Sequence, residues 1–191
     1  MGQRSQIYLR HNGDLVFANY YQWNYGERMV SRARWGIGYI KLFAEKGYEW
    51  VFRDPAYVLK MRRFFDVNFD MHDIQISSDI LKEREEQFPD EDFNDFVFDA
   101  QDNNDGQLFV DIRGEKIFYA FTDGYRIRKI MDAEAYMEWD AGDWRNSEYI
   151  KPEMKAACEA NIKAISEMAE LMTPEQLEDF VHGYSDPVKP F

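Results

Sequence analysis

The sequence has almost no cysteine, since Cys158 is the single one among 191 residues. One cysteine excludes a disulfide within the chain and any zinc site built mainly from cysteine thiolates. Long uncharged apolar runs are also missing, and no apolar segment of the secretory type follows the first residues. The sequence therefore predicts neither a membrane span nor a signal peptide, and we expect a protein of the cytoplasm.

Signature motifs of common enzyme classes are missing as well. The chain has no Gly-x-Ser-x-Gly elbow, no phosphate-binding loop and no His-Glu-x-x-His zinc motif. Residues 101–112 resemble a calcium-binding loop, but Gln101 and Ile112 stand where its first and last carboxylates are required. Cys158 falls on the apolar side of a helical pattern, which predicts a buried and unreactive thiol. The sequence thus favours a protein without enzymatic activity and predicts no cofactor.

Charge is plentiful but unevenly distributed along the chain. The 36 Asp and Glu residues outnumber the 23 Lys and Arg residues, which gives a formal net charge of −13. Residues 1–63 hold 11 basic and 5 acidic residues, a net of +6, so the remaining residues have a net charge of −19. Residues 79–105, called the acidic segment below, hold 11 carboxylates against Lys82 and Arg84, a net of −9. Such a segment either solvates an aromatic-rich protein or binds a basic partner.

Partner binding would use the central carboxylates of the acidic segment. The candidates are Glu85, Glu86, Asp90, Glu91, Asp92, Asp95 and Asp99. Duplex DNA carries about one charge per 1.7 Å of its axis, whereas this segment as a helix would carry about one per 4.5 Å. That density is closer to one strand than to a duplex. We therefore expect an acidic wedge that mimics DNA only in part and fits a groove of a basic nucleic-acid-binding protein.

A second group of residues combines cations with aromatic rings. Arg28, Arg32, Trp35 and Tyr39, called the basic stripe below, fall on one flank of the helix expected at residues 25–46. Cations beside flat rings can hold single-stranded nucleic acid by stacking and charge. The same residues can equally pair with the acidic half of the chain. Both interpretations remain open from the sequence.

The best metal candidates are weak. Asp66 and Asp70 are one helical turn apart, and His72 follows them, so the three could share one side of a helix end. Solvated carboxylates are the commoner explanation for such a group. We therefore predict no metal site, and retain these residues only as candidates for a metal-dependent reaction.

The apolar pattern predicts one α+β domain over residues 1–191, with a basic aromatic part (1–70) and an acidic part of strands and helices (71–191). The first part should begin with a β-hairpin that turns at Asn12-Gly13, the strongest turn signal in the chain. Two helices should follow at 25–46 and 54–65, and Ser77 or Ser78 should cap a short acidic helix.

The acidic part should contain an antiparallel meander followed by helices. The expected strands are 96–98, 107–112, 116–121 and 125–130. Asp132 should cap one helix, Pro152 should open a long one, and Thr173-Pro174-Glu175-Gln176 should begin the last as a capping box. An apolar stripe predicts the buried face of the long helix: Met154, Cys158, Ile162, Ile165, Met168 and Met172.

The N-terminus carries a family resemblance. Residues Gly2 to Tyr8 and Gln22 to Met29 resemble the opening of small acidic proteins carried by prophages and mobile elements of Gram-positive bacteria, among which type II anti-CRISPR inhibitors occur. The resemblance covers about the first 30 residues and includes no catalytic residue. It implies a bacterial host cell as the setting.

The resemblance and the acidic segment together predict a non-enzymatic inhibitor of a host-defence nuclease. The specific expectation is an anti-CRISPR protein that blocks the nucleic-acid-binding groove of a type II RNA-guided endonuclease. The alternative is a nucleic-acid-binding or metal-dependent nucleic-acid-cleaving protein of a mobile element, which would use the basic stripe. A regulatory module of the mobile element with an unrelated partner is a third possibility.

Overall fold

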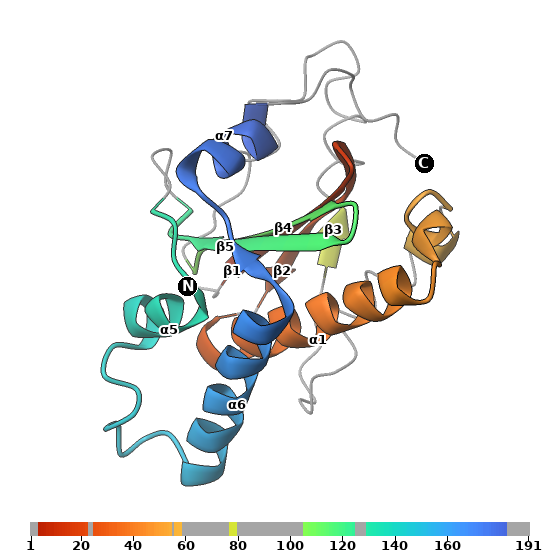
Figure 1. The fold of residues 1–191 in the computed structure, drawn as a ribbon. Helices are drawn as coiled ribbons and strands as arrows, with labels where there is room; N and C mark the ends of the chain where they lie inside the picture. Colours follow the sequence, from red (N-terminus) through yellow and green to blue (C-terminus); the bar gives the residue numbers. More distant parts are fainter. Residues whose placement is uncertain are drawn as a thin grey trace.

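A computed structural model describes residues 4–22, 25–54, 56–58, 77–79, 105–124 and 129–182 (Figure 1). Its strands form one sheet in the order β3-β2-β1-β4-β5-β6. The strands are β1 (Arg4–His11), β2 (Asp14–Gln22), β3 (Ser77–Asp79), β4 (Gln107–Arg113), β5 (Lys116–Thr122) and β6 (Glu170–Leu171). The helices are α1 (Gly26–Glu45), the 3₁₀ helix η1 (Glu49–Phe52), α5 (Ala133–Ala141), α6 (Pro152–Met168) and α7 (Pro174–His182). This mixture of sheet and helices confirms the predicted α+β class.

The predicted N-terminal hairpin is confirmed and becomes the centre of the sheet. Asn12 and Gly13 both adopt positive φ angles, 50° and 94°, as the expected two-residue turn requires. Strand β1 then pairs in parallel with β4, from Gln6 opposite Gln107 to His11 opposite Ile112. The hairpin and the central strands therefore share one sheet.

Only part of the predicted meander is present in the described residues. Strands β4 and β5 form its antiparallel hairpin, as expected. Residues 129–130 were expected to end a further strand, but they lie outside any strand, and Met131 makes a single bridge to Phe121. Asp132 begins a helix directly afterwards, which leaves no room for further pairing. The predicted strand 96–98 lies outside the described residues.

The prediction for Ser77 and Ser78 is wrong. These residues do not cap a helix but belong to β3, which pairs antiparallel with β2 from Tyr21 opposite Ser77 to Asn19 opposite Asp79. The backbone groups on the outer side of β2 need hydrogen-bond partners, and pairing with β3 satisfies them. The hydrogen bonds gained by pairing with β2 outweigh the local tendency of serine to begin a helix.

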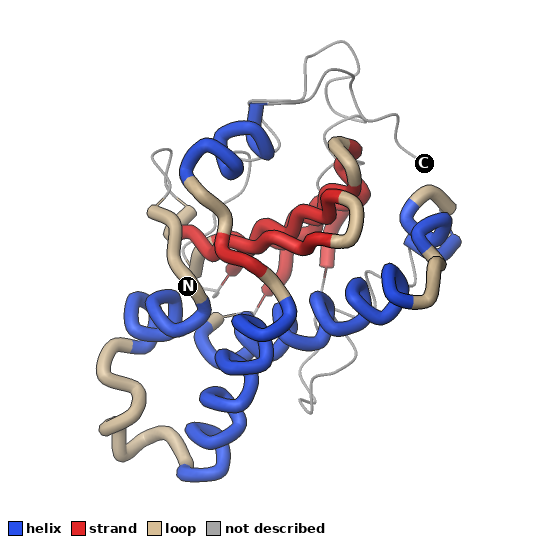
Figure 2. The backbone as a smooth tube through the Cα atoms, viewed as in Figure 1, coloured by secondary structure: helices blue, strands red, loops and turns tan. Residues whose placement is uncertain are grey.

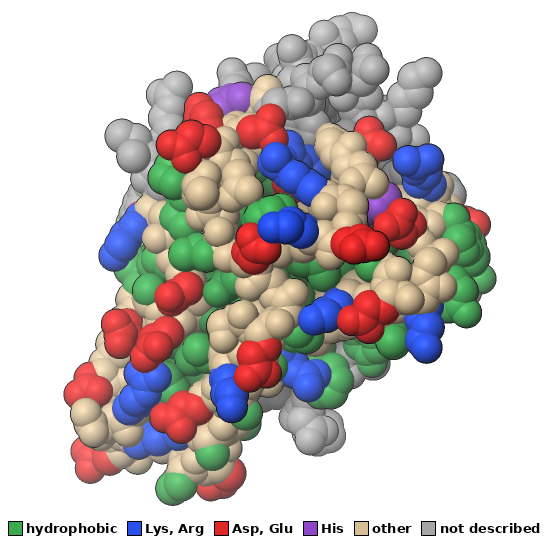
Figure 3. All heavy atoms as spheres, in the orientation of Figure 1, with side chains coloured by type: hydrophobic (Ala, Val, Ile, Leu, Met, Phe, Trp, Pro, Cys, Tyr) green, Lys and Arg blue, Asp and Glu red, His purple; other side chains and the backbone are tan. Residues whose placement is uncertain are grey.

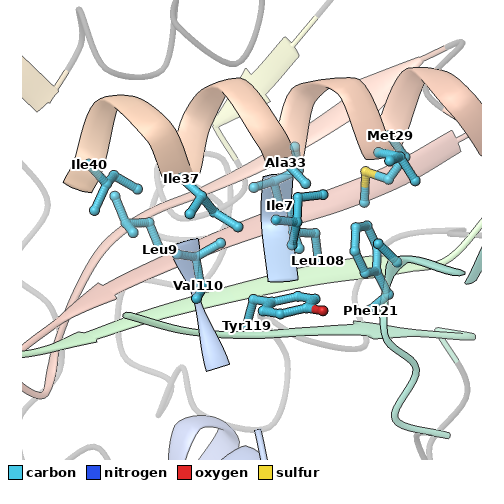
Figure 4. Close-up of a cluster of buried hydrophobic side chains, with 14 of the residues drawn as sticks. Ile7, Leu9, Met29, Ala33, Ile37, Ile40, Leu108, Val110, Tyr119 and Phe121 are labelled. Atoms are coloured by element: carbon cyan, nitrogen blue, oxygen red, sulfur yellow. The ribbon is translucent and has the colours of Figure 1, made fainter. Parts of the chain in front are cut away.

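Helices cover both faces of the sheet. Helices α1, α5 and α6 lie on one face and α7 lies on the other (Figures 1 and 2). The alternation of side chains along β1 explains this arrangement, because Ile7 and Leu9 are buried in the cluster with α1, while Tyr8 is buried in the cluster with α7. Figure 4 shows the contact of α1 with the sheet, where Met29, Ala33, Ile37 and Ile40 point at the apolar residues of the strands.

The helix starts expected in the C-terminal part are confirmed. The Asp132 carboxylate accepts a hydrogen bond from the Ala135 backbone N–H at 2.8 Å. At the start of α7 both bonds of the capping box form: the Gln176 N–H donates to Thr173 Oγ1 at 3.2 Å, and the Thr173 N–H donates to Gln176 Oε1 at 2.8 Å.

The stripe predicted along α6 is only partly buried. Cys158 and Ile165 are buried, whereas Met154 is 39% exposed near the start of the helix. Met172 lies beyond the end of α6 and packs in the cluster on the other face of the sheet. Cys158 is the buried thiol that we predicted, and burial, with a further contribution from Glu27, raises its pKa to about 12.

Candidate functional site

Most of the predicted site residues lie outside the described residues. This applies to the seven candidate carboxylates of the acidic segment (Glu85, Glu86, Asp90, Glu91, Asp92, Asp95 and Asp99) and to Asp66, Asp70 and His72. The structure does describe both ends of the acidic segment. Asp79 is the last residue of β3, and Asp105 comes two residues before β4. The sheet therefore holds the segment at both ends.

Asp105 is fixed by bonds to two neighbouring elements. Its carboxylate accepts a hydrogen bond from the Arg4 backbone N–H, and its own N–H donates to the Arg4 carbonyl at 3.0 Å. Its carbonyl accepts a hydrogen bond from the Tyr136 hydroxyl at 2.8 Å. The next residue, Gly106, has φ +88°, and a Cβ there would lie 2.3 Å from the Thr122 carbonyl oxygen. Only glycine fits this position, so the end of the acidic segment is held against β1 and α5.

Two more carboxylates lie close to Asp105. Glu27 is in the first turn of α1 and Asp140 is near the end of α5, and we call these three residues the carboxylate cluster. Gly26 makes the close approach possible, because its φ is +45° and a Cβ there would lie 2.9 Å from Asp140 Oδ2. The Gly26 backbone N–H donates a hydrogen bond to Asp140. Three separate elements thus bring negative charge to one place.

Burial and the neighbouring negative charges both affect the ionisation of Asp140. Burial raises the pKa of Asp140 to about 7, and the negative charges of Asp105 and Glu27 contribute in the same direction. The hydrogen bond from Gly26 acts in the opposite direction but is outweighed. In the described part of the chain, neither Glu27 nor Asp140 forms an ion pair. Glu27 and Asp140 thus bring two carboxylates without a described ion-pair partner next to Asp105.

The described residues hold no group of three His, Cys, Asp or Glu side chains arranged to bind a metal ion. The carboxylate cluster is included in that finding. The cluster does not form an open surface, because Asp105 is buried and Glu27 and Asp140 are half-buried. Figure 3 shows acidic and basic side chains intermixed over α5 and α6 at the lower left, where Arg145 lies close to Glu134 and Glu159.

The basic stripe divides into two pairs. Arg28 and Arg32 are only 8% and 1% exposed, and their guanidinium groups lie over the rings of Tyr25 and Tyr21 at 4.9 and 4.7 Å. In this arrangement the two arginines stack on the protein's own rings. The sequence placed them correctly on one flank of α1 but could not show what covers that flank.

The other pair of the stripe faces solvent. Trp35 is 37% exposed, and Tyr39 is half-buried with its ring centroid 6.3 Å from that of Trp35. The guanidinium of Arg34 lies 3.7 Å from the centroid of the Trp35 ring. Sequence reasoning missed Arg34 because it sits one residue outside the helical stripe. Its contact with Trp35 makes it the cation of this surface.

A second aromatic group lies where α1 meets η1. Tyr48, Trp50 and Tyr57 are exposed, and the rings of Trp50 and Tyr57 meet edge to face with centroids 4.9 Å apart. Hydrophobic side chains are visible over this corner at the right edge of Figure 3. Acidic and basic residues alternate around it, with Lys46 and Arg53 near Glu49 and Asp54. The corner is therefore aromatic but not strongly charged.

The face covered by α7 contains an ion-pair network that the sequence did not reveal. Arg10 donates to both oxygens of Asp111, at 3.0 and 2.7 Å, and both side chains are buried. Asp179 on α7 accepts from Arg10 at 2.8 Å and from Arg113 at 2.7 Å. Burial would raise the pKa of Asp179, but its bonds to the two arginines lower it overall. The network fastens α7 to β1 and β4.

Comparisons with models of protein families, with curated proteins and with solved structures found no match. The function must therefore be inferred from the residues of this chain. Among the described residues, none of the helices has both the length and the apolar character needed to cross a membrane.

Proposed function

We propose that this chain is a non-enzymatic inhibitor that binds a basic nucleic-acid-binding protein through its acidic segment. The proposed target is a host-defence nuclease. Its most specific form is an anti-CRISPR protein of a prophage or mobile element that occupies the nucleic-acid-binding groove of a type II RNA-guided endonuclease in the cytoplasm of a bacterial host.

The main support for this proposal is the negative charge of the acidic segment and of the residues at its end. Residues 79–105 have a net charge of −9, and Asp105 at their end lies with Glu27 and Asp140. A groove that binds nucleic acid is lined by Lys and Arg, and its field attracts such an anionic surface over several ångströms.

Inhibition would follow from occupancy. Carboxylates that neutralise the Lys and Arg of a groove compete directly with phosphates for the same cations. Because the charge density of the segment is nearer to one strand than to a duplex, the protein would fill part of a groove as a wedge. The competition should weaken as salt screens both partners.

The test is a DNA cleavage assay with a purified RNA-guided endonuclease and its guide. The charge-reversal variant to compare with the wild type carries Asp90→Lys, Glu91→Lys, Asp92→Lys and Asp95→Lys. Each reversal adds two charges, so four of them change the net charge from −13 to about −5. We expect this variant to lose inhibition and co-purification with the endonuclease.

A matched control separates the segment from total charge. Glu148, Glu153, Glu167 and Glu178 are exposed carboxylates elsewhere on the surface, and their reversal to Lys gives the same net charge. This control should still inhibit. Equal inhibition by the wild type and both variants would refute the proposal, and equal loss in both variants would assign the effect to net charge alone.

A second candidate function is favoured by the exposed pair of the basic stripe. Trp35, with Arg34 stacked on it, is a surface on which a base of single-stranded nucleic acid can stack. If the protein also cleaves nucleic acid, Asp66, Asp70 and His72 are the residues to hold a metal. Incubation of labelled RNA and DNA with Mg²⁺ or Mn²⁺ distinguishes the two functions, because an inhibitor leaves both substrates intact.

A further inference from the structure

Two tight turns are joined by hydrogen bonds at one end of the sheet. Asn12 lies in the turn between β1 and β2, and Gly114 lies in the turn between β4 and β5. The Asn12 backbone N–H donates to the Ile112 carbonyl at 2.7 Å. The Asn12 side chain makes two more contacts, since its Oδ1 accepts from the Gly114 backbone N–H at 2.9 Å and its Nδ2 lies 3.2 Å from His11 Nε2.

The bond to Gly114 fixes the orientation of the Asn12 amide. A backbone N–H can only donate, so the amide oxygen must face Gly114 and the NH₂ group must face His11. An NH₂ group also can only donate, so His11 Nε2 must accept. An accepting Nε2 requires a neutral imidazole with its proton on Nδ1. The geometry of the two bonds therefore specifies both the charge and the tautomer of His11.

The surroundings of His11 also favour an uncharged ring. The residue is only 3% exposed, and its ring lies against that of Phe52 in η1, with the two centroids 4.7 Å apart. Burial of this kind removes the water that would stabilise an imidazolium ion.

Charged groups of both signs face the ring of His11. Glu49 and Arg53 face it from η1 and its end, Asp14 from the start of β2, and Asp111 from β4, where Asp111 already pairs with two arginines. Burial is the largest influence and lowers the pKa of His11 below its ordinary value of 6.5, and Arg53 acts in the same direction. The three carboxylates act in the opposite direction and are outweighed.

We propose that His11 makes the contact between the two turns sensitive to pH: the neutral ring maintains the bonds from His11 through Asn12 to Gly114, and a proton on His11 Nε2 breaks them. With that proton in place, two donors face each other. Rotation of the Asn12 amide would offer His11 an oxygen, but it would then set the NH₂ group against the Gly114 N–H. One of the two bonds is lost in either case. This sensitivity belongs to the fold and does not depend on the proposed partner.

The sign of the effect on stability follows from linkage. As the pH falls below 6.5, the unfolded chain binds a proton on His11 that the folded chain does not yet hold. In this window the unfolded state binds more protons, so the contribution of His11 makes stability fall as the pH falls. Once the pH is below the lowered pKa of the folded chain, both states are protonated and the contribution levels off.

The first experiment observes the ring in the wild-type protein and needs no variant to fold. Two-bond ¹H–¹⁵N NMR spectra distinguish protonated from unprotonated imidazole nitrogens. Near neutral pH, His11 should show an unprotonated Nε2 and a protonated Nδ1, and its titration midpoint should lie below 6.5. The Gly114 amide signal should shift with the same midpoint, because its acceptor is disturbed. A protonated Nε2 near neutral pH, a midpoint at or above 6.5, or a Gly114 signal that does not follow His11 would overturn the proposal.

The second experiment uses Asn12→Asp, which changes one atom group of the side chain. Aspartate tolerates the positive φ of 50° at this position and keeps an oxygen for the Gly114 N–H, but its second oxygen accepts where the NH₂ group donated. A carboxylate beside the ring stabilises the imidazolium ion, so the His11 midpoint should rise above 6.5. The melting temperature should then fall less on acidification below pH 6.5 than it does in the wild type.

The matched control is Asn146→Asp, which adds the same charge in the exposed loop between α5 and α6. It should leave the His11 midpoint and the pH dependence of the melting temperature as they are in the wild type. An unchanged His11 midpoint in Asn12→Asp, or an equal rise in the control, would overturn the proposal, because the Asn12 side chain would then not govern the ionisation of His11.

Discussion

At the scale of single residues, the buried pair of Arg10 and Asp111 is the most consequential contact. Both side chains are at most 3% exposed, and the two hydrogen bonds between them are joined by a contact of Arg10 with the Phe180 ring at 4.6 Å. Neither charge can be solvated by water in this position. Each therefore depends on its charged partners, which include Asp179 on α7 for Arg10 and Arg113 for Asp111.

Replacement of Asp111 by Asn should destabilise the protein strongly. The change leaves the buried Arg10 with a neutral amide in place of one carboxylate and with Asp179 as its remaining anionic partner. Loss of one partner of a buried ion pair typically costs about 3 kcal/mol or more. The measurement is the free energy of unfolding from chemical denaturation. The control is Glu170→Gln, which breaks the exposed pair with Lys116 and should cost under about 1 kcal/mol. Similar losses of unfolding free energy in the two variants would mean that burial does not determine how much these ion pairs contribute to stability.

For single residues, the sequence predicted position on a helix or strand but not burial or long-range partners. Arg28 and Arg32 belong to a helical stripe that can be read from spacing, but whether they reach solvent depends on their packing over Tyr25 and Tyr21. Arg10 and Asp111 alternate with apolar residues on two strands, a pattern that predicts solvent exposure and does not pair them, whereas the structure buries both. Contacts between residues about a hundred positions apart are invisible to local patterns.

At the scale of elements, the parts predicted correctly are those governed by local chemistry. The turn at Asn12-Gly13, the cap at Asp132 and the box at Thr173 each follow from a few adjacent residues. The parts that differ depend on distant partners. Strand β3 forms because the outer side of β2 needs pairing, and the parallel contact of β1 with β4 has no short-range signal.

The capping box of α7 gives a prediction at this scale. Thr173→Ala removes the hydroxyl that accepts from Gln176, and loss of such a cap costs about 1 kcal/mol. Hydrogen exchange of the α7 amides should accelerate about fivefold if the helix opens locally. Ser166→Ala is the control, since Ser166 is exposed within α6 and its hydroxyl donates only to Lys163 of the same helix. An unchanged exchange rate in Thr173→Ala would show that packing alone holds the helix start.

At the scale of the whole molecule, the distribution of charge decides how the protein meets nucleic acid. The net charge of −13 repels phosphates, while Trp35 and Arg34 offer a small local surface for stacking. The sequence predicted the candidate site only as an uneven distribution of charge, with a basic first third and an acidic remainder. What the sequence could not show is that Asp105 meets Glu27 and Asp140, which come from separate elements.

Binding of naked single-stranded DNA or RNA should consequently be weak. We expect detectable binding at low salt and none near physiological ionic strength, because log K falls about 0.7 units per decade of salt for each phosphate neutralised. Fluorescence titration of the wild type with labelled DNA or RNA measures this affinity. Trp35→Ala is the variant that should reduce it, and Tyr149→Ala is the control, because Tyr149 is exposed and distant in sequence from the basic stripe. Arg28→Gln with Arg32→Gln should lower stability, because both side chains are buried. Tight, salt-resistant binding by the wild type would favour the nucleic-acid function over inhibition.

The parallel pairing of β1 with β4 also sets the order of folding. Gln6 lies opposite Gln107, so the centre of the sheet joins residues 101 positions apart. During synthesis the N-terminal hairpin leaves the ribosome long before its neighbour exists, and one edge of β1 stays open until then. Such a high contact order slows folding, and any product truncated before residue 107 must expose that edge to other chains. Shortened forms of this protein should therefore aggregate.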